Sequence, residues 1–172
     1  MLNIFVNTWG NYNENGADGG KWITLPCEDI NGALDSITYD INDLDPEFFI
    51  NDYEWTTDLD FREISEMENI EELNDEITAL AELDIHEQEI FCAAVEQWGY
   101  QYVDIDSIDE YVLYTDIHTD YDLGYYLVND AGIYDLKQMG TLANYIDYEA
   151  FGRDVRFESD GGFTSLGWIE RC

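Results

Sequence analysis

The chain has 172 residues, 45% of them hydrophobic and 15% aromatic, so it contains enough apolar material for a core and is not a disordered acidic tail. Its 40 Asp and Glu against six Lys and Arg give a formal net charge of −34. That balance excludes a protein that holds nucleic acid by its phosphates, because such contacts require Lys and Arg.

The first 60 residues alternate runs of branched and aromatic residues with Asn, Gly and Pro, a pattern typical of strands separated by turns. It predicts strands at residues 2–8, 21–25 and 47–55 and a short helix within residues 27–37. Residues 9–20, rich in Asn and Gly, are expected to form a long loop. We therefore predict an N-terminal α+β unit over residues 1–60.

From Phe61 to Leu80 apolar residues recur every three or four positions, and Glu occupies most of the remaining ones. This spacing predicts an amphipathic helix, or two joined ones, with one strongly negative face. A second helix is predicted from Ile85 to Trp98, where Gly99 supplies a stop signal. Residues 61–103 are therefore predicted to be a helical acidic middle unit.

The remaining residues, 104–172, predict a second α+β unit. Its predicted helices begin at a capping pair, Thr119 with Asp122, and at Thr141. The first ends near Gly132 and the second near Phe151. The predicted strands are residues 100–105, 111–115, 153–158 and 163–169, the last two forming a hairpin around Gly161-Gly162. The predicted fold class is α+β: an elongated chain of three small units, two of them mixed α/β and flanking a helical middle segment.

The charge is spread over the whole chain. Residues 1–60 have 13 acids and one base (−12), residues 61–110 have 16 and one (−15), and residues 111–172 have 11 and four (−7). At least 34 carboxylates lack a basic partner, and they must lie on the surface because burying an unpaired carboxylate is too costly. Duplex DNA has roughly two charges per base pair, so this excess matches on the order of 17 base pairs.

This charge pattern favours a DNA mimic, a protein whose carboxylates occupy the basic groove of a DNA-binding protein. Halophilic proteins also have acidic surfaces, and acidic residues aid solubility, but a net charge of a few units suffices for that. The candidate contacts are outward acids: Asp40, Asp43, Asp45, Glu63, Glu66, Glu71, Glu72, Asp75, Glu76, Asp104, Asp106, Asp109 and Glu110.

Motifs for catalysis or metal binding are weak. The segment Asn11-x-Asn13-x-Asn15-Gly16 has the early spacing of a calcium loop, but its first position is Asn and its twelfth is Trp22. His86 shares a predicted helical face with Glu82 and Glu89, a combination that arises easily by chance in a Glu-rich helix. We expect no catalytic residue, no metal and no cofactor. An acidic calcium-binding protein and a mimic aimed at another DNA-binding protein remain the alternatives.

The three cysteines are far apart and form no C-x-x-C pair, which fits a reducing cytoplasm rather than a disulfide framework or a zinc site. The first residues lack the basic and long apolar regions of a signal peptide, and no run is long enough to span a membrane. We therefore expect a cytoplasmic protein with no membrane contact.

The segment LANYIDYEAFGRDV, residues 142–155, closely resembles the antirestriction motif of the ArdA family. Shorter stretches resemble other patterns of that family: Tyr12-Asn13-Glu14, Gly20-Lys21-Trp22, Leu25-Pro26 and Ile50-Asn51-Asp52-Tyr53-Glu54, where Asn51 replaces a common His. The resemblance extends over essentially the full length and is densest at residues 142–155.

The resemblance implies a protein of mobile genetic elements such as conjugative plasmids and transposons. It implies an elongated homodimer of three-domain chains that mimics bent B-form DNA. Such proteins inhibit Type I restriction–modification enzymes by occupying the DNA groove of the specificity subunit and the methyltransferase core. By the same resemblance, the C-terminal unit supplies the dimer contact.

The motif also has a physical interpretation. Three of its aromatic residues, Tyr145, Tyr148 and Phe151, are spaced by three and are expected along one face of a helix that Gly152 ends. A structural or dimer-forming role fits this better than direct contact with a basic groove. The residues assigned to that role are Leu142, Tyr145, Asp147, Tyr148, Phe151, Gly152, Arg153 and Asp154.

Overall fold

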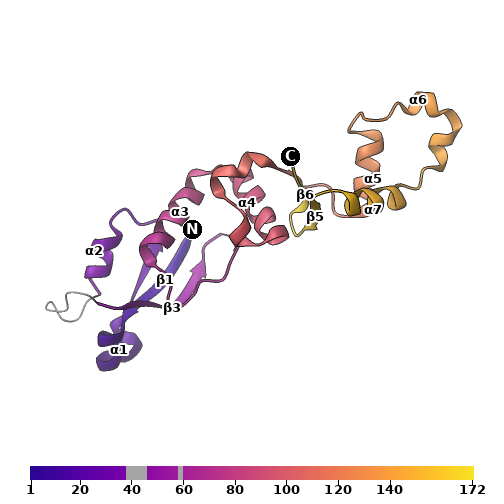
Figure 1. Cartoon of the computed structure of the whole chain (residues 1–172). Coiled ribbons are helices and arrows are strands. Elements are labelled where there is room, and N and C mark those ends of the chain that lie inside the picture. Colours follow the sequence, from indigo (N-terminus) through magenta and orange to yellow (C-terminus); the bar gives the residue numbers. More distant parts are fainter. Residues whose placement is uncertain (38–45, 58–59) are drawn as a thin grey trace. The chain divides into compact units, whose positions relative to one another are not determined.

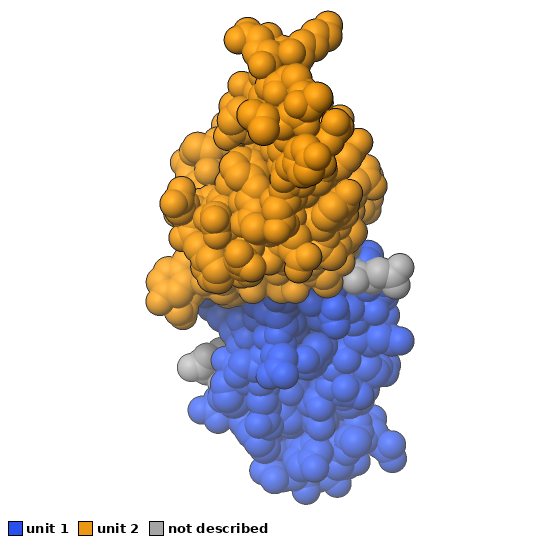
Figure 2. All heavy atoms as spheres, turned by 90° about the vertical axis from the view of Figure 1, so that its right-hand side faces the viewer, with its two compact units in different colours: residues 1–84 blue, residues 85–172 orange. Residues whose placement is uncertain are grey.

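The computed structural model describes residues 1–37, 46–57 and 60–172. The chain divides into two compact units, Met1–Asp84 and Ile85–Cys172, which are coloured separately in Figure 2. Each unit combines helices with a three-stranded antiparallel sheet (Figure 1), which confirms the α+β class. The finer division into units at 1–60, 61–103 and 104–172 remains a prediction.

In the first unit β1 (Leu2–Thr8) is the central strand, with β2 (Lys21–Leu25) on one side and β3 (Phe48–Trp55) on the other. Every second residue at the start of β1, namely Leu2, Ile4 and Val6, is fully buried, as expected for a strand with one face on a core. All three strands predicted for this region are confirmed.

The helices α2 (Ile30–Asp35) and α3 (Ile70–Glu82) contribute apolar side chains to the same core. The prediction of a helix from Phe61 was wrong for residues 61–69. The helix begins only at Ile70, because the Asn69 side chain accepts hydrogen bonds from the first free N–H groups, those of Glu71 and Glu72. Ile64 is nevertheless buried, so the apolar spacing of this segment reflects core packing in an irregular conformation.

Residues 61–69 are held by Arg62. Its guanidinium binds both oxygens of Glu76, at 3.2 and 2.6 Å, and one oxygen of Glu68 at 3.1 Å. The Ile50 N–H of β3 also donates to the Glu66 carbonyl. Burial alone would lower the pKa of Arg62, but the hydrogen bonds to Glu76 and Glu68 outweigh it, so its pKa lies above the usual value and the side chain stays charged.

The loop predicted for residues 9–20 is instead helical, with α1 (Trp9–Asn15) followed by the 3₁₀ turn η1 (Gly16–Gly19). The Thr8 hydroxyl caps α1 by accepting from the Asn11 N–H. Asn11 is itself buried and donates to the Gly19 and Ile37 carbonyls. Long-range hydrogen bonds therefore stabilise a helix that the local Asn and Gly content disfavours.

In the second unit α4 (Ile85–Trp98) packs on a sheet of order β4-β6-β5, formed by Tyr111–Tyr114, Gly167–Arg171 and Gly161–Thr164. The Glu96 carboxylate accepts hydrogen bonds from both N–H and hydroxyl of Ser165 in the β5–β6 turn. Helix α4 and its end at Gly99, which has φ of 91°, are confirmed. The strand predicted at residues 100–105 is wrong: η2 (Tyr100–Tyr102) is a 3₁₀ turn, and η3 (Ile105–Glu110) follows.

Two glycines let α5 (Asp120–Asn129) and α7 (Tyr148–Glu158) touch through their backbones (Figure 1). A Cβ atom on Gly124 would collide with the Tyr148 carbonyl, and one on Gly152 would collide with the Asp120 carbonyl. Beside this contact the Arg156 guanidinium binds both oxygens of Asp120, at 2.7 and 3.3 Å. Backbone contact and ion pair together fix the two helices.

This crossing corrects several predictions. Gly152 lies inside α7 and does not end it, because its missing side chain is required by the neighbouring helix. The helix starts at Tyr148, where Asp147 caps it, so Tyr145 lies outside, in the 3₁₀ turn η4 (Gly140–Tyr145) that follows α6 (Leu136–Met139). Residues 153–158 are helical, and the hairpin is formed by β5 and β6. The capping pair is confirmed: Asp122 N–H donates to the Thr119 hydroxyl.

We predict that Gly152→Val destabilises the second unit by about 1–3 kcal/mol, because backbone carbonyls cannot move aside as flexible side chains do. Urea unfolding followed by circular dichroism measures the change. Gly10→Ala in α1 is the control, since an added methyl meets nothing there. Equal unfolding midpoints for the two variants would contradict the proposed backbone contact.

We also predict that Arg62→Met lowers the free energy of unfolding, by at most about 3–5 kcal/mol, because it leaves Glu68 and Glu76 together without a cation. The double variant Arg62→Met with Glu76→Met should recover part of the loss, since it removes an orphaned carboxylate as well. Thermal unfolding of both variants tests this. A double variant less stable than the single one would argue against the pairing.

Candidate functional site

Acidic residues dominate both units. Residues 1–84 contain 22 acidic and two basic residues, a net of −20, and residues 85–172 contain 18 and four, a net of −14. Several of the bases are already engaged close to home: Arg62 with Glu68 and Glu76, Arg156 with Asp120, and Arg153 with Asp154 at 3.8 Å. Local ion pairing therefore removes little of the negative charge.

The α3 acidic set comprises Glu63, Glu66, Glu71, Glu72 and Asp75, and all five are exposed. Glu71 and Glu72 lie in the first turn of α3, where the positive end of the helix dipole stabilises them. Glu76 differs from the others: its side chain is only 17% exposed and binds Arg62. It stabilises the fold and has little surface to offer a partner.

The η3 acidic set comprises Asp104, Asp106, Asp109 and Glu110, and all four are exposed on one short segment of the second unit. Asp104 also caps this segment by accepting from the Asp106 N–H at 3.1 Å. The three remaining acids of the prediction, Asp40, Asp43 and Asp45, lie outside the described residues. Outward carboxylates are therefore present in each unit.

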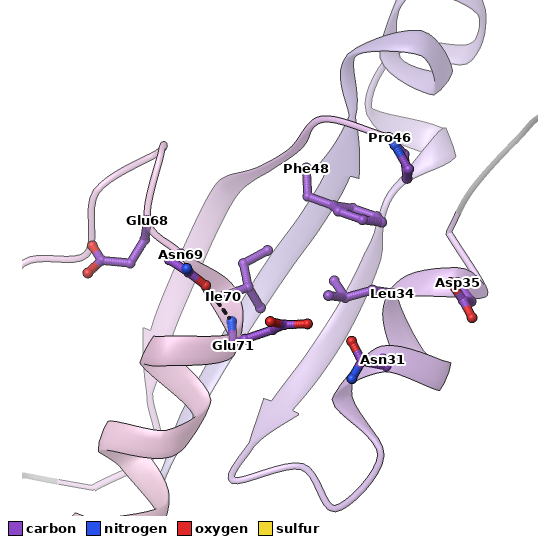
Figure 3. Close-up of a pocket in the computed structure, with 9 residues that line it drawn as sticks. All are labelled: Asn31, Leu34, Asp35, Pro46, Phe48, Glu68, Asn69, Ile70 and Glu71. Atoms are coloured by element: carbon purple, nitrogen blue, oxygen red, sulfur yellow. Dashed lines mark hydrogen bonds between the residues drawn. The ribbon is translucent and has the colours of Figure 1, made fainter. Parts of the chain in front are cut away.

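A surface hollow of about 370 Å³ lies beside the start of α3 (Figure 3). Apolar side chains of Leu34, Phe48 and Ile70 line it, and Asp35 and Glu71 add carboxylates. The dashed line in Figure 3 marks the bond by which Asn69 accepts from the Glu71 N–H, so the helix end is already capped. The hollow is thus a negative site with an apolar part, and it does not suit an anion.

Neither metal motif of the sequence is assembled. Among residues 1–37, 46–57 and 60–172, no group of three or more His, Cys, Asp or Glu side chains is placed to hold a metal ion. Asn11 is engaged in backbone hydrogen bonds, as described above. Glu82 ends α3 whereas His86 lies in α4, so the helical face expected for these two residues does not exist.

The residues of the antirestriction motif fall into two groups. Asp147, Tyr148 and Gly152 build α7 and its contact with α5, and Phe151 packs edge-on against Tyr134 at 5.9 Å. The others, Leu142, Tyr145, Arg153 and Asp154, are exposed.

The two exposed apolar residues stand out, since Leu142 is 68% and Tyr145 84% exposed. They continue an exposed apolar stretch that also contains Ile133, Tyr134 and Met139. Apolar residues gathered on one exposed segment mark a surface that contacts another protein. We call residues 133–145 the exposed motif segment.

Sequence reasoning missed three features: the ion pairs of Arg62 and Arg156, and the tyrosines exposed on α5. Each depends on residues distant in sequence that only the fold brings together. Within the described part of the chain, no helix is both long and apolar enough to cross a membrane.

A comparison with protein families adds an independent result. The model of the family described as Antirestriction protein (ArdA) matches residues 4–170, nearly the whole chain. No curated protein matches the chain. Because the family match extends through both units and includes the motif of residues 142–155, the chain belongs to the ArdA family of antirestriction proteins.

Proposed function

We propose that the chain is a DNA mimic that inhibits Type I restriction–modification enzymes. Its surface carboxylates would enter the DNA groove formed by the specificity subunit and the methyltransferase core and would exclude DNA from it. The observation that supports this most is the outward position of the α3 and η3 acidic sets in a chain whose basic residues are largely engaged elsewhere.

The physical basis is the one by which a basic groove binds DNA. Phosphate contacts supply much of the affinity for DNA and steer its approach, and preformed carboxylates supply the same kind of attraction. The carboxylates of the α3 acidic set lie on a helix with a buried apolar face, so little ordering is required when they bind. Each exposed contact is weak, and affinity comes from their number.

We further propose that the protein is a homodimer joined through the exposed motif segment. Ile133, Leu142 and Tyr145 are 64%, 68% and 84% exposed in the single chain, and a second copy would cover them. A two-fold contact uses the same patch on both chains, so a single apolar segment suffices. Dimerisation would also double the number of carboxylates presented to the enzyme.

Neutralising the α3 acidic set should weaken inhibition far more than any single substitution. The triple variant Glu71→Gln, Glu72→Gln, Asp75→Asn should need at least about tenfold more protein to displace DNA from a Type I methyltransferase core, whereas each single variant should change this less than about fivefold. The assay is competition against labelled target DNA at several salt concentrations, with weaker displacement expected at higher salt.

The matched control removes three charges elsewhere in the first unit, at the exposed residues Glu14, Asp18 and Glu28. If both triple variants lose the same affinity, total charge matters and the α3 acidic set does not. Absence of displacement by the unmodified protein even at low salt would defeat the proposed target.

Replacing exposed apolar residues of the motif segment should weaken the dimer. Leu142→Ser with Tyr145→Ser removes apolar surface that the single chain leaves exposed, so the fold should survive while the association constant falls. Sedimentation velocity over a range of concentrations measures the mass. Met67→Ser, at a 64% exposed site in the first unit, is the control. An unchanged mass for the double variant would place the dimer contact elsewhere.

A further inference from the structure

A second hollow, of about 420 Å³, lies in the second unit along α5. Seven residues line it, from α5 and from the turn before it: Asp116, Ile117, Tyr121, Asp122, Tyr125, Tyr126 and Asp130. We call it the tyrosine–aspartate pocket. Its volume lies in the range of about 300–1,000 Å³ that is usual for ligand pockets. It contains no residue of either acidic set or of the antirestriction motif.

Aromatic rings form one side of this pocket. Tyr121 and Tyr125 lie one helical turn apart with their rings nearly parallel, at 24° and 6.2 Å between centroids. Tyr148 of α7 packs against both, at 5.7 and 5.4 Å. The two rings are therefore supported by a third, yet Tyr121 is 50% and Tyr125 43% exposed. Supported but accessible ring faces are what a stacking ligand requires.

Tyr126 is fixed in a similar way, by the Tyr114 ring at 5.1 Å. Ile117 is 95% buried by its exposed fraction of 5% and gives the pocket an apolar floor. The pocket therefore offers fixed aromatic and aliphatic surface on which the stem of a long side chain can lie.

Carboxylates complete the pocket. Asp122 accepts hydrogen bonds from the Thr119 hydroxyl at 2.7 Å and from the His118 N–H at 3.3 Å, and these bonds lower its pKa, so it remains ionised. Asp116 and Asp130 are exposed and form no hydrogen bond or ion pair with any residue that the structure describes. No Lys or Arg lines the pocket, so its negative charge is available to a cation.

We propose that the tyrosine–aspartate pocket binds an arginine side chain of a protein partner. A guanidinium group stacks on aromatic rings and sheds water more readily than an ammonium group, and its fork of N–H donors matches a carboxylate. The three tyrosines and three aspartates of the pocket supply both kinds of contact. The sign of the charge excludes phosphates and other anions.

This inference rests on the proposed function only in naming the partner, a protein with a basic DNA-binding groove. It gives that complex a contact of a different kind. Exposed ion pairs weaken as salt rises, whereas stacking of a guanidinium on rings persists. Tyr and Arg are also the residues enriched at the contacts that dominate protein interfaces. The pocket would therefore fix the register of a complex that diffuse charge alone attracts.

The direct test uses a small probe and no enzyme. N-acetyl-L-arginine amide is titrated into the full chain, and backbone amide shifts are followed by ¹H–¹⁵N NMR. We expect saturable shifts at residues 116–130, with affinity on the order of millimolar. The citrulline analogue, neutral but nearly the same shape, should bind at least about fivefold more weakly, and the lysine analogue should also bind more weakly.

Two variants assign the binding to the pocket. Asp116→Asn with Asp130→Asn should weaken arginine binding at least about fivefold, whereas the matched control, Asp106→Asn with Asp109→Asn, should change it less than about twofold. Tyr121→Leu should weaken binding by removing a ring, and Tyr121→Phe should retain it, which separates stacking from loss of fold.

Equal binding of the arginine and citrulline analogues would overturn the proposal, as would tighter binding of lysine. So would shifts spread over all acidic segments without saturation, or equal losses in the pocket and control variants. A positive titration together with no displacement of DNA from the methyltransferase core would keep the pocket and reject the proposed target. Displacement without arginine binding would do the opposite.

Discussion

Repulsion among 40 acidic residues, with only six bases to offset it, is the constraint on which the rest of the structure depends. Each unit opposes this repulsion with an apolar core, formed around Leu2, Ile4 and Ile77 in one and around Leu123 and Trp168 in the other. The buried polar side chains of the described residues are Asn and Thr, never Asp or Glu. Carboxylates are thus kept in water, where their mutual repulsion is screened most strongly.

The scarce bases lie where two segments have to be joined. Arg62 fastens an irregular segment to α3 through Glu76, and Arg156 joins α7 to Asp120 of α5 beside the glycine contact. Each such pair withdraws a carboxylate from the surface and stabilises the fold. The remaining acids are left unpaired on the outside, so the structural use of the bases and the negative surface have the same origin.

Features that depend on local pattern were predictable from the sequence, and those that depend on distant partners were not. Alternation identified β1, and the pair Thr119 and Asp122 identified the start of α5. Gly152 looked like a helix end because the helix that crosses it lies about 30 residues earlier in the chain. Glu76 looked like an outward acid because its partner Arg62 is 14 residues away, beyond any helical spacing.

The candidate site follows the same division. That most acids face outward follows from their excess alone, so the acidic sets could be expected without a structure. The tyrosine–aspartate pocket could not, because Asp116 and Ile117 join it from a turn and Tyr148 supports its rings from another helix. Dispersed charge attracts a basic groove from many directions with little preference for one alignment. Fixed rings beside unpaired carboxylates accept one side chain in one orientation, so a mimic that has both can be attracted quickly and still be held in a single register.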